Sequence, residues 1–256
     1  MDRVDRLTTL MERFSLSVTS APLGEATLVV YALSNGGAKR MQFRTSGKAL
    51  RAPVGEIVFA ARFDWGGGDN PLVAALPDVV DFDLSEDSEC RGLIEVMESE
   101  LAGKRCGAGS VVSRLGEVMV VRMLRAQIES GTTHASLLAG LSDPRLSRAI
   151  VAMHDAPGRT WRNDELARVA GLSLSRFSEL FLTKVGETPA AYLRRWRLIL
   201  ARQDVAKGDR VETISRRYGY RSPEGFARAF KKHFGDNPVS LRGSDGVAMS
   251  NISKSG

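Results

Sequence analysis

Hydrophobic positions recur at helical intervals in the last third of the chain. Phe226, Phe230 and Phe234 occupy positions i, i+4 and i+8, so they line one side of an α-helix. Basic residues surround this stripe, and Gly235 followed by Pro238 ends the helical pattern. The pattern predicts a short amphipathic helix with an aromatic inner side and a positive outer side.

The same pattern occurs 49 residues earlier in the chain. Before each aromatic stripe lies a second short helical segment that ends in glycine, at 163–171 and at 211–219. A helix, a tight glycine turn and a second helix make up a helix-turn-helix, which places its second helix in the DNA major groove. Two copies are therefore expected, joined by a helix over 189–208. The matching positions are Phe177 with Phe226, Phe181 with Phe230, Gly186 with Gly235, and Pro189 with Pro238.

The first third of the chain shows the pattern of β-strands instead. Two β-rich runs flank Asn35 and Gly36, the dipeptide favoured in tight hairpin turns. Further strand candidates cover 57–63 and 79–82 and are separated by Gly, Pro and Asp. Short strands divided by such turns are typical of a small β-barrel.

From about residue 88 the pattern becomes helical again. Two helices are predicted, over 90–103 and 113–131. A helical stripe of this kind fits either a core contact or a contact between two copies of the chain. The stripe positions are Leu93, Ile94, Met97 and Leu101 in the first helix and Leu115, Val118, Met119, Arg122 and Met123 in the second.

The positive charge of the protein is concentrated in the part that carries the two helical repeats. Residues 143–243 contain 20 Lys and Arg against 11 Asp and Glu, whereas residues 1–142 contain 15 against 18. A basic region joined to a mildly acidic one marks the basic region as the part that faces phosphates.

With these features in place, the sequence resembles a known family. The stretches LARVAGLSLSRFSELFLTKVGETPAAYLRRWRLILA (166–201) and VETISRRYGYRSPEGFARAFKKHFGDNPVSLR (211–242) resemble the AraC/XylS-type bacterial transcription regulators. The stretches 70–82 and 141–161 are similar to the branch of that family with a cupin-like sensor domain. The resemblance implies a homodimer that binds promoter DNA and RNA polymerase, acts as an activator and responds to a small-molecule effector.

The expected fold is α+β with four parts. A cupin-like β-barrel that binds the effector covers 1–86, and a helical hairpin for dimerisation covers 87–142. A domain with two helix-turn-helix motifs covers 143–243, and a tail covers 244–256. The sequence has no run of 18 apolar residues that could span a membrane, and its acidic, weakly apolar N-terminus does not resemble a secretory signal, so a cytoplasmic protein is expected.

Side chains that face DNA are predicted from their positions in the two motifs. Arg228 is expected to be the best base reader, because a guanidinium can bridge guanine O6 and N7. Glu179 stands where arginine is common in the family; it can accept from a cytosine amine, position the protein, or simply face water. The full set is Ser175, Arg176, Ser178 and Glu179 in the first motif, and Arg221, Ser222, Glu224, Arg228, Lys231 and Lys232 in the second.

The linker helix is expected to contact DNA phosphates through its arginines. Its apolar residues should point inward and its arginines outward. Leu193, Trp196 and Leu200 form the predicted inner side, and Arg194, Arg195, Arg197 and Arg202 the predicted outer side.

An effector site is predicted at 39–44. Arg40 and Arg44 form an RxxxR spacing that resembles the arginine motif of PilZ domains, which grip cyclic di-GMP. On a strand, Arg40, Gln42 and Arg44 share one face, while Met41 and Phe43 point to the other. Cyclic di-GMP is therefore the first effector candidate; a solvated arginine face, another metabolite, or redox sensing remains open.

Enzymatic function is not expected. Residues 1–133 contain no histidine, the usual ligand of cupin metal sites, and neither a nucleophile motif nor a phosphate loop is present. No catalytic residue, cofactor or metal is predicted. Cys90 and Cys106 lack metal-site spacing and are interpreted as ordinary thiols, with oxidation as the alternative. A second class of function, a non-metal cupin enzyme or scaffold tethered to DNA by the basic domain, stays open.

Overall fold

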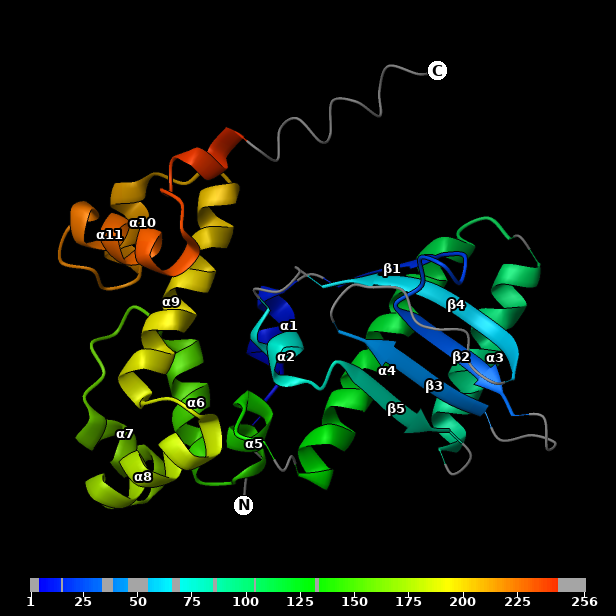
Figure 1. Ribbon diagram of the computed structural model, residues 1–256, viewed down its shortest axis with the longest axis horizontal. Helices are drawn as coiled ribbons and strands as arrows, with labels where there is room; N and C mark the ends of the chain where they lie inside the picture. Colours follow the sequence, from blue (N-terminus) through cyan, green and yellow to red (C-terminus); the bar gives the residue numbers. More distant parts are fainter. Residues whose placement is uncertain are drawn as a thin grey trace. The chain divides into compact units, whose positions relative to one another are not determined.

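The computed structural model describes residues 5–14, 16–33, 39–45, 55–65, 70–84, 87–103, 105–131 and 134–243 (Figure 1). The chain divides into two compact units. One unit comprises residues 10–142, and the other comprises residues 1–9 together with 143–256. Within the described ranges, no helix is long and apolar enough to cross a membrane.

Five strands of the first unit form one antiparallel sheet in the order β1-β4-β2-β3-β5. The strands predicted from the sequence are confirmed, and β2 pairs with β3 as expected for a hairpin, although Asn35 and Gly36 lie outside the described residues. In the described part of the chain, β1 and β5 are the edge strands of the sheet. The bounds are Ser17–Ser20 (β1), Leu28–Ala32 (β2), Lys39–Arg44 (β3), Glu56–Asp64 (β4) and Val79–Asp83 (β5).

Helices α3 (Ser88–Ala102) and α4 (Ala108–Ser130) lie behind the sheet in Figure 1 and pack on each other, α3 also on β4 and α4 on β1. At Gly116 an added Cβ would lie 2.6 Å from Val18 of β1, so only glycine lets α4 approach this closely. The predicted stripe of α4 is wrong at Val118, which is 46% exposed. Val112, Met119, Met123 and Ile128 are among the residues that α4 buries.

Three short helices complete the described elements before residue 143. α2 packs on α5, and Asn70 caps the N-terminus of α2 by accepting a hydrogen bond from Leu72 N at 2.9 Å. The bounds are Thr8–Arg13 (α1), Pro71–Ala75 (α2) and Leu137–Ser142 (α5).

The second unit is helical. The predicted helix pairs and linker helix are confirmed, and α6 precedes them. Phe177, Phe181, Phe226 and Phe230 are fully buried, as their spacing predicts, whereas Phe234 is only half-buried. The helices are α6 (Leu146–Asp155), α7 (Asn163–Ala170), α8 (Leu174–Val185), α9 (Pro189–Ala206), α10 (Val211–Arg217) and α11 (Pro223–Phe234), followed by a 3-10 helix, Ser240–Gly243.

Helix ends in this unit follow the residue types that the sequence places there. Ser173 caps α8 and Ser222 caps α11, each accepting from a backbone N–H three residues later. Gly186 and Gly235 adopt the left-handed conformation at the C-termini, with φ of 87° and 86°. The two copies therefore begin and end their second helices in the same way.

Candidate DNA-binding surface

The first helix-turn-helix consists of α7 and α8, joined by a turn at Gly171. Phe177, Leu180 and Phe181 of α8 are buried, so the opposite side of this helix faces solvent. Ser175 and Glu179 lie on that exposed side, as the sequence predicts, and Ser178 is half-buried. Helix α8 is thus a candidate recognition helix.

An ion pair occupies the charged residues of this helix. Arg176 Nη1 donates to Glu179 Oε2 at 2.9 Å, one turn along α8. Leu182, which is 50% exposed, lies on the same outer side. We call Ser175, Glu179, Leu182 and Thr183 the α8 outer stripe. With Arg176 paired to Glu179, this side of α8 offers little net positive charge to DNA.

The second helix-turn-helix consists of α10 and α11. Phe226 and Phe230 fix its inner side, and Tyr220 packs its ring on Phe226 with the centroids 5.3 Å apart. The exposed side carries Glu224, Arg228, Lys231 and Lys232, which we call the α11 outer stripe.

The basic side chains of the α11 outer stripe are exposed to solvent. Across residues 134–243, no hydrogen bond or ion pair engages the side chains of Arg228, Lys231 or Lys232. Hydrogen bonds from the backbone of Glu224 and from the Ser222 side chain lower the pKa of the Glu224 carboxyl, and the charge of Arg228 adds a smaller effect. Arg221, in the turn before α11, is also exposed. Three cations stay available for phosphates or bases.

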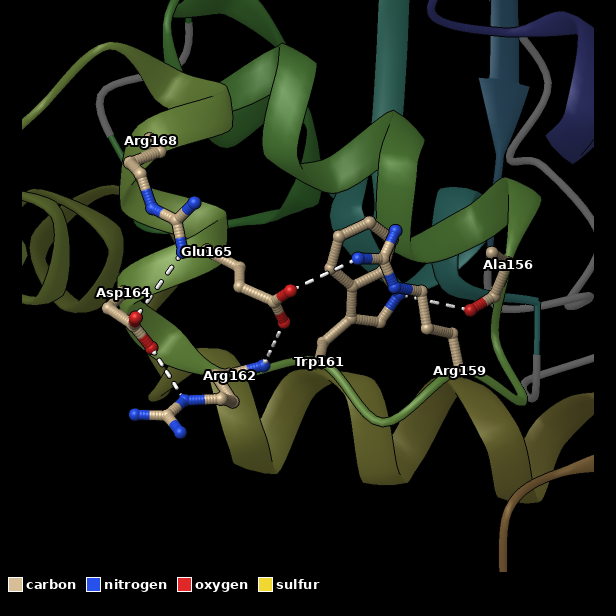
Figure 2. A network of polar contacts seen from close by, with 7 residues as sticks. All are labelled: Ala156, Arg159, Trp161, Arg162, Asp164, Glu165 and Arg168. Carbon is tan, nitrogen blue, oxygen red and sulfur yellow. Dashed lines mark hydrogen bonds and ion pairs between the residues drawn. The ribbon is translucent and has the colours of Figure 1, made fainter.

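The start of α7 carries a network that the sequence did not single out (Figure 2). Arg162 Nε and Arg168 Nη2 both donate to Asp164, at 3.0 and 3.4 Å. Arg159 donates to Glu165 at 3.1 Å, and its guanidinium lies 4.1 Å from the centre of the Trp161 ring. Each arginine has a carboxylate partner, so the network orders the start of α7 more than it adds positive charge.

The linker helix α9 only partly matches its prediction. Leu193, Trp196 and Leu200 are buried, as expected. Arg194 is exposed, in agreement with a role at phosphates.

The other linker arginines have partners inside the protein. Arg195 donates to Glu187 at 2.6 Å, and Arg202 lies 4.9 Å from the Phe234 ring centre. Arg197 donates to two backbone carbonyls. These three guanidinium groups already make contacts within the helical unit, so Arg194 is the linker arginine most available to phosphates. A phosphate contact of Arg195 stays a prediction.

The predicted effector residues lie on β3 of the sheet. Met41 and Phe43 are buried, which confirms the predicted alternation along the strand. Arg40 Nη2 and Gln42 Nε2 both donate to Asp81 of β5, at 2.8 and 2.9 Å. The carboxylate of Asp81 raises the pKa of Arg40, so this guanidinium is already neutralised by a partner.

Arg44 differs from Arg40. Its Nε is buried and makes no hydrogen bond to any residue that the structure describes. The two arginines of the RxxxR spacing therefore have different surroundings, since Arg40 is paired with Asp81 and the Nε of Arg44 is not paired with a described residue.

Comparisons with known proteins agree with this architecture. A model of the helix-turn-helix domain family matches residues 166–244, and a model of the cupin family matches residues 14–129. The chain joins an AraC-family helix-turn-helix domain to a cupin domain. A Streptomyces lividans protein described as an AraC-like transcription regulator is 30% identical over 199 residues, which cover 75% of this chain and 66% of that protein.

One further sequence relative and one solved structure are also similar to the chain. The HTH-type transcriptional regulator AlkR of Acinetobacter baylyi is 30% identical over 178 residues, covering 68% of this chain and 58% of AlkR. The structure of ToxT from Vibrio cholerae is similar over 91% of this chain and 98% of ToxT, with 10% identity and a TM-score of 0.43. The chain spans between half and two thirds of the length of the two sequence relatives.

Sequence reasoning missed two buried polar groups of the AraC-family domain. Asp204 of α9 accepts from Tyr218 Oη and Arg217 Nη1, both at 2.6 Å. His154 of α6 is fully buried, with Nε2 2.5 Å from the hydroxyl of Tyr192. Burial, and to a lesser extent the charge of Arg195, lower the pKa of His154 to about 3. No local pattern marks such residues, because their partners come from other helices.

The cysteines of the cupin domain are far apart along its fold. Cys90 lies in the first turn of α3, whereas Cys106 follows the end of that helix, and the helix from Cys90 to Ala102 is about 18 Å long at about 1.5 Å per residue. A disulfide needs Cα atoms within about 7 Å. Burial and Asp87 raise the pKa of the Cys90 thiol to about 11, which opposes thiolate chemistry there. These facts disfavour an internal disulfide switch.

Proposed function

We propose that the protein is a transcription regulator that binds promoter DNA with both helix-turn-helix motifs. The observation that carries the proposal is the exposed α11 outer stripe, with three unoccupied cations on a helix whose inner side is anchored by buried aromatic rings. A recognition helix needs this combination of a rigid anchor and free donors. Helices α8 and α11 would enter successive major grooves, held by α9.

The side chains divide between bases and phosphates. Arg228 lies in the middle of α11 and would read guanine through its planar fork. Lys232, Arg221 and Arg194 would contact phosphates, which fixes the register of the protein without reading sequence. Glu179 would read a cytosine amine only if it leaves Arg176, its present partner.

Sequence preference separates a regulator from an enzyme or scaffold that is merely tethered to DNA. A regulator is expected to bind one promoter segment roughly 10³-fold to 10⁷-fold more tightly than bulk DNA. The measurement is a competition titration of a selected site against random duplexes at fixed salt. Equal affinity for both DNAs would exclude a sequence-specific regulator and favour an enzyme or scaffold that is tethered to DNA.

We further propose that the cupin domain binds a small effector and thereby controls dimerisation and promoter activation by RNA polymerase. The finer proposal names cyclic di-GMP, held by Arg40, Gln42 and Arg44. Arg44 supports it, since its buried Nε has no hydrogen-bond partner among the described residues. Arg40 opposes it, because a ligand phosphate has to displace Asp81 first.

Calorimetric titration with cyclic di-GMP tests the finer proposal. The expected result is binding with a dissociation constant on the order of 1 μM, which disappears in Arg44→Ala and persists in weakened form in Arg40→Ala. The matched control is Arg62→Ala, an exposed arginine on β4 of the same sheet. Absence of heat at millimolar ligand would exclude this nucleotide and leave other metabolites.

A further inference from the structure

The loop that precedes the first helix-turn-helix contacts the second motif through bare backbone. Gly158 lies in the loop between α6 and α7, and an added Cβ there would collide with the carbonyl oxygen of Arg217 at the end of α10. On the other side, an added Cβ at Gly219 would lie 2.6 Å from the carbonyl oxygen of Gly158. Gly219 also has a φ of 72°, in the left-handed region that favours glycine. The contact therefore requires glycine on both sides.

Arg197 of the linker helix α9 binds the loop at Gly158 as well. Its Nε donates to Pro157 O at 2.6 Å and its Nη2 donates to Arg159 O at 2.8 Å, so one guanidinium holds both neighbours of Gly158. The group is half-buried, and this burial lowers the pKa of Arg197. A desolvated guanidinium used on backbone carbonyls is unavailable to DNA.

The loop is equally fixed on its other side, where it leads into the first motif (Figure 2). Trp161 Nε1 donates to Ala156 O at 3.0 Å, which closes the loop on itself. Glu165 of α7 accepts from Arg159 Nη2 and from Arg162 N, each at 3.1 Å. The 156–162 loop is thus tied to the start of α7, to α9 and to the turn that precedes α11.

We propose that this 156–162 loop fixes the distance and rotation between the recognition helices α8 and α11, and so sets the half-site spacing that the protein accepts. The inference rests on the proposed DNA-binding function. Gly158, Gly219 and Arg197 act as positioning residues, because none of them is placed at the DNA. Half-sites on one face of DNA repeat about every 10 base pairs, so each inserted pair rotates the second half-site by roughly 35°. A rigid pair of motifs cannot follow such a rotation.

The test compares spacing profiles. The full-length protein is titrated with its selected site and with derivatives that carry one, two or five extra base pairs between the half-sites. Wild type is expected to lose on the order of 100-fold in affinity at five extra pairs, because linked modules lose their avidity when both cannot engage. In Arg197→Gln the loss is expected to shrink at least several-fold at one and two extra pairs, since the clamp is gone.

Arg202→Gln is the matched control. It removes the same charge from the same helix but leaves the contacts of Gly158 in place. It is expected to keep the wild-type profile, with the same small uniform loss of affinity as Arg197→Gln on a single half-site. Gly158→Ala is expected to broaden the profile further while lowering the melting temperature.

The outcomes separate the two proposals. A folded Arg197→Gln variant with the wild-type spacing profile would overturn the inference, as would a wild-type protein that prefers a sequence yet tolerates every spacing. A wild-type protein with no preferred sequence would overturn the proposed function, and this inference with it.

Discussion

Helices α8 and α11 bury matching side chains and expose different ones. Each second helix starts at a serine cap, buries two phenylalanines four residues apart and ends at a left-handed glycine. On the exposed side, Ser175, Glu179, Leu182 and Thr183 of α8 stand where α11 has Glu224, Arg228, Lys231 and Lys232. The inner side is constrained by packing within the motif, whereas the outer side is constrained only by what it contacts.

Because their exposed sides differ, the two motifs are expected to contribute unequally to DNA binding. The α11 outer stripe carries three unoccupied cations, while Glu179 on α8 is paired with Arg176. Phosphate contacts supply most of the salt-dependent affinity for DNA. The second motif is therefore expected to provide most of the electrostatic attraction, and the first mainly position and local selectivity.

The largest loss of stability is expected when a buried phenylalanine that the two motifs share is truncated. Phe177→Ala and Phe226→Ala each remove a fully buried ring, so each should lower the free energy of unfolding by about 3 to 5 kcal/mol. Leu182→Ala, at a half-exposed position, is the control and should cost less than about 0.5 kcal/mol. Denaturant titration measures all three. A large loss in only one motif would mean that the two inner sides are not equivalent.

Base reading by an arginine at this position is expected in α11 only, since α8 has Glu179 where α11 has Arg228. Arg228→Ala is expected to weaken the preferred site by about 1 to 3 kcal/mol with little effect on random DNA. Lys232→Ala should weaken both DNAs alike, because a phosphate contact carries no sequence information. Parallel titrations with the two DNAs distinguish these results. Uniform weakening by Arg228→Ala would move base reading to another residue.

Acid should destabilise the domain through His154 of α6, which packs on Trp196 with ring centres 4.3 Å apart. Burial lowers the pKa of this residue to about 3, below its ordinary value of 6.5, so only the unfolded chain takes up its proton between these pH values. Between pH 7 and 5.5, its contribution to the free energy of unfolding should fall by about 1 kcal/mol. Denaturant titrations across that range check this, and His154→Leu should flatten the dependence. An equally steep dependence in the variant would assign it to other groups.

Much of this architecture could be predicted from local pattern. The aromatic spacing and the glycine and proline stops locate α8 and α11, and alternation along 39–44 places Met41 and Phe43 inside the sheet. Strand β1 was missed, since four residues with only Val18 buried leave too short a pattern.

The contacts between distant segments could not be predicted. Arg197 lies in an arginine-rich run and was expected at phosphates, yet it holds a loop from before α7. Arg40 was expected to grip a ligand, yet Asp81 from another strand neutralises it. In both cases the partner is set by tertiary structure, and the sequence pattern around the arginine is the same with or without it.

A smaller effect concerns salt. A double Lys231→Ala and Lys232→Ala variant should reduce the slope of log affinity against log salt concentration by about 2, since each neutralised phosphate contributes about 0.9. The matching change on α8, Leu182→Ala with Thr183→Ala, should leave the slope unaltered. Titrations between roughly 50 and 200 mM salt provide the slopes. Equal slopes for the two double variants would contradict the unequal tasks of the motifs.

Site selection from random DNA with the wild type and with Arg228→Ala tests whether both motifs bind DNA and whether Arg228 reads a base. We expect a two-part site with half-sites about one helical turn apart, and a variant that loses preference at one base pair in one half only. The same two-part sequence at unchanged affinity from the variant, or a one-part sequence from the wild type, would contradict the account.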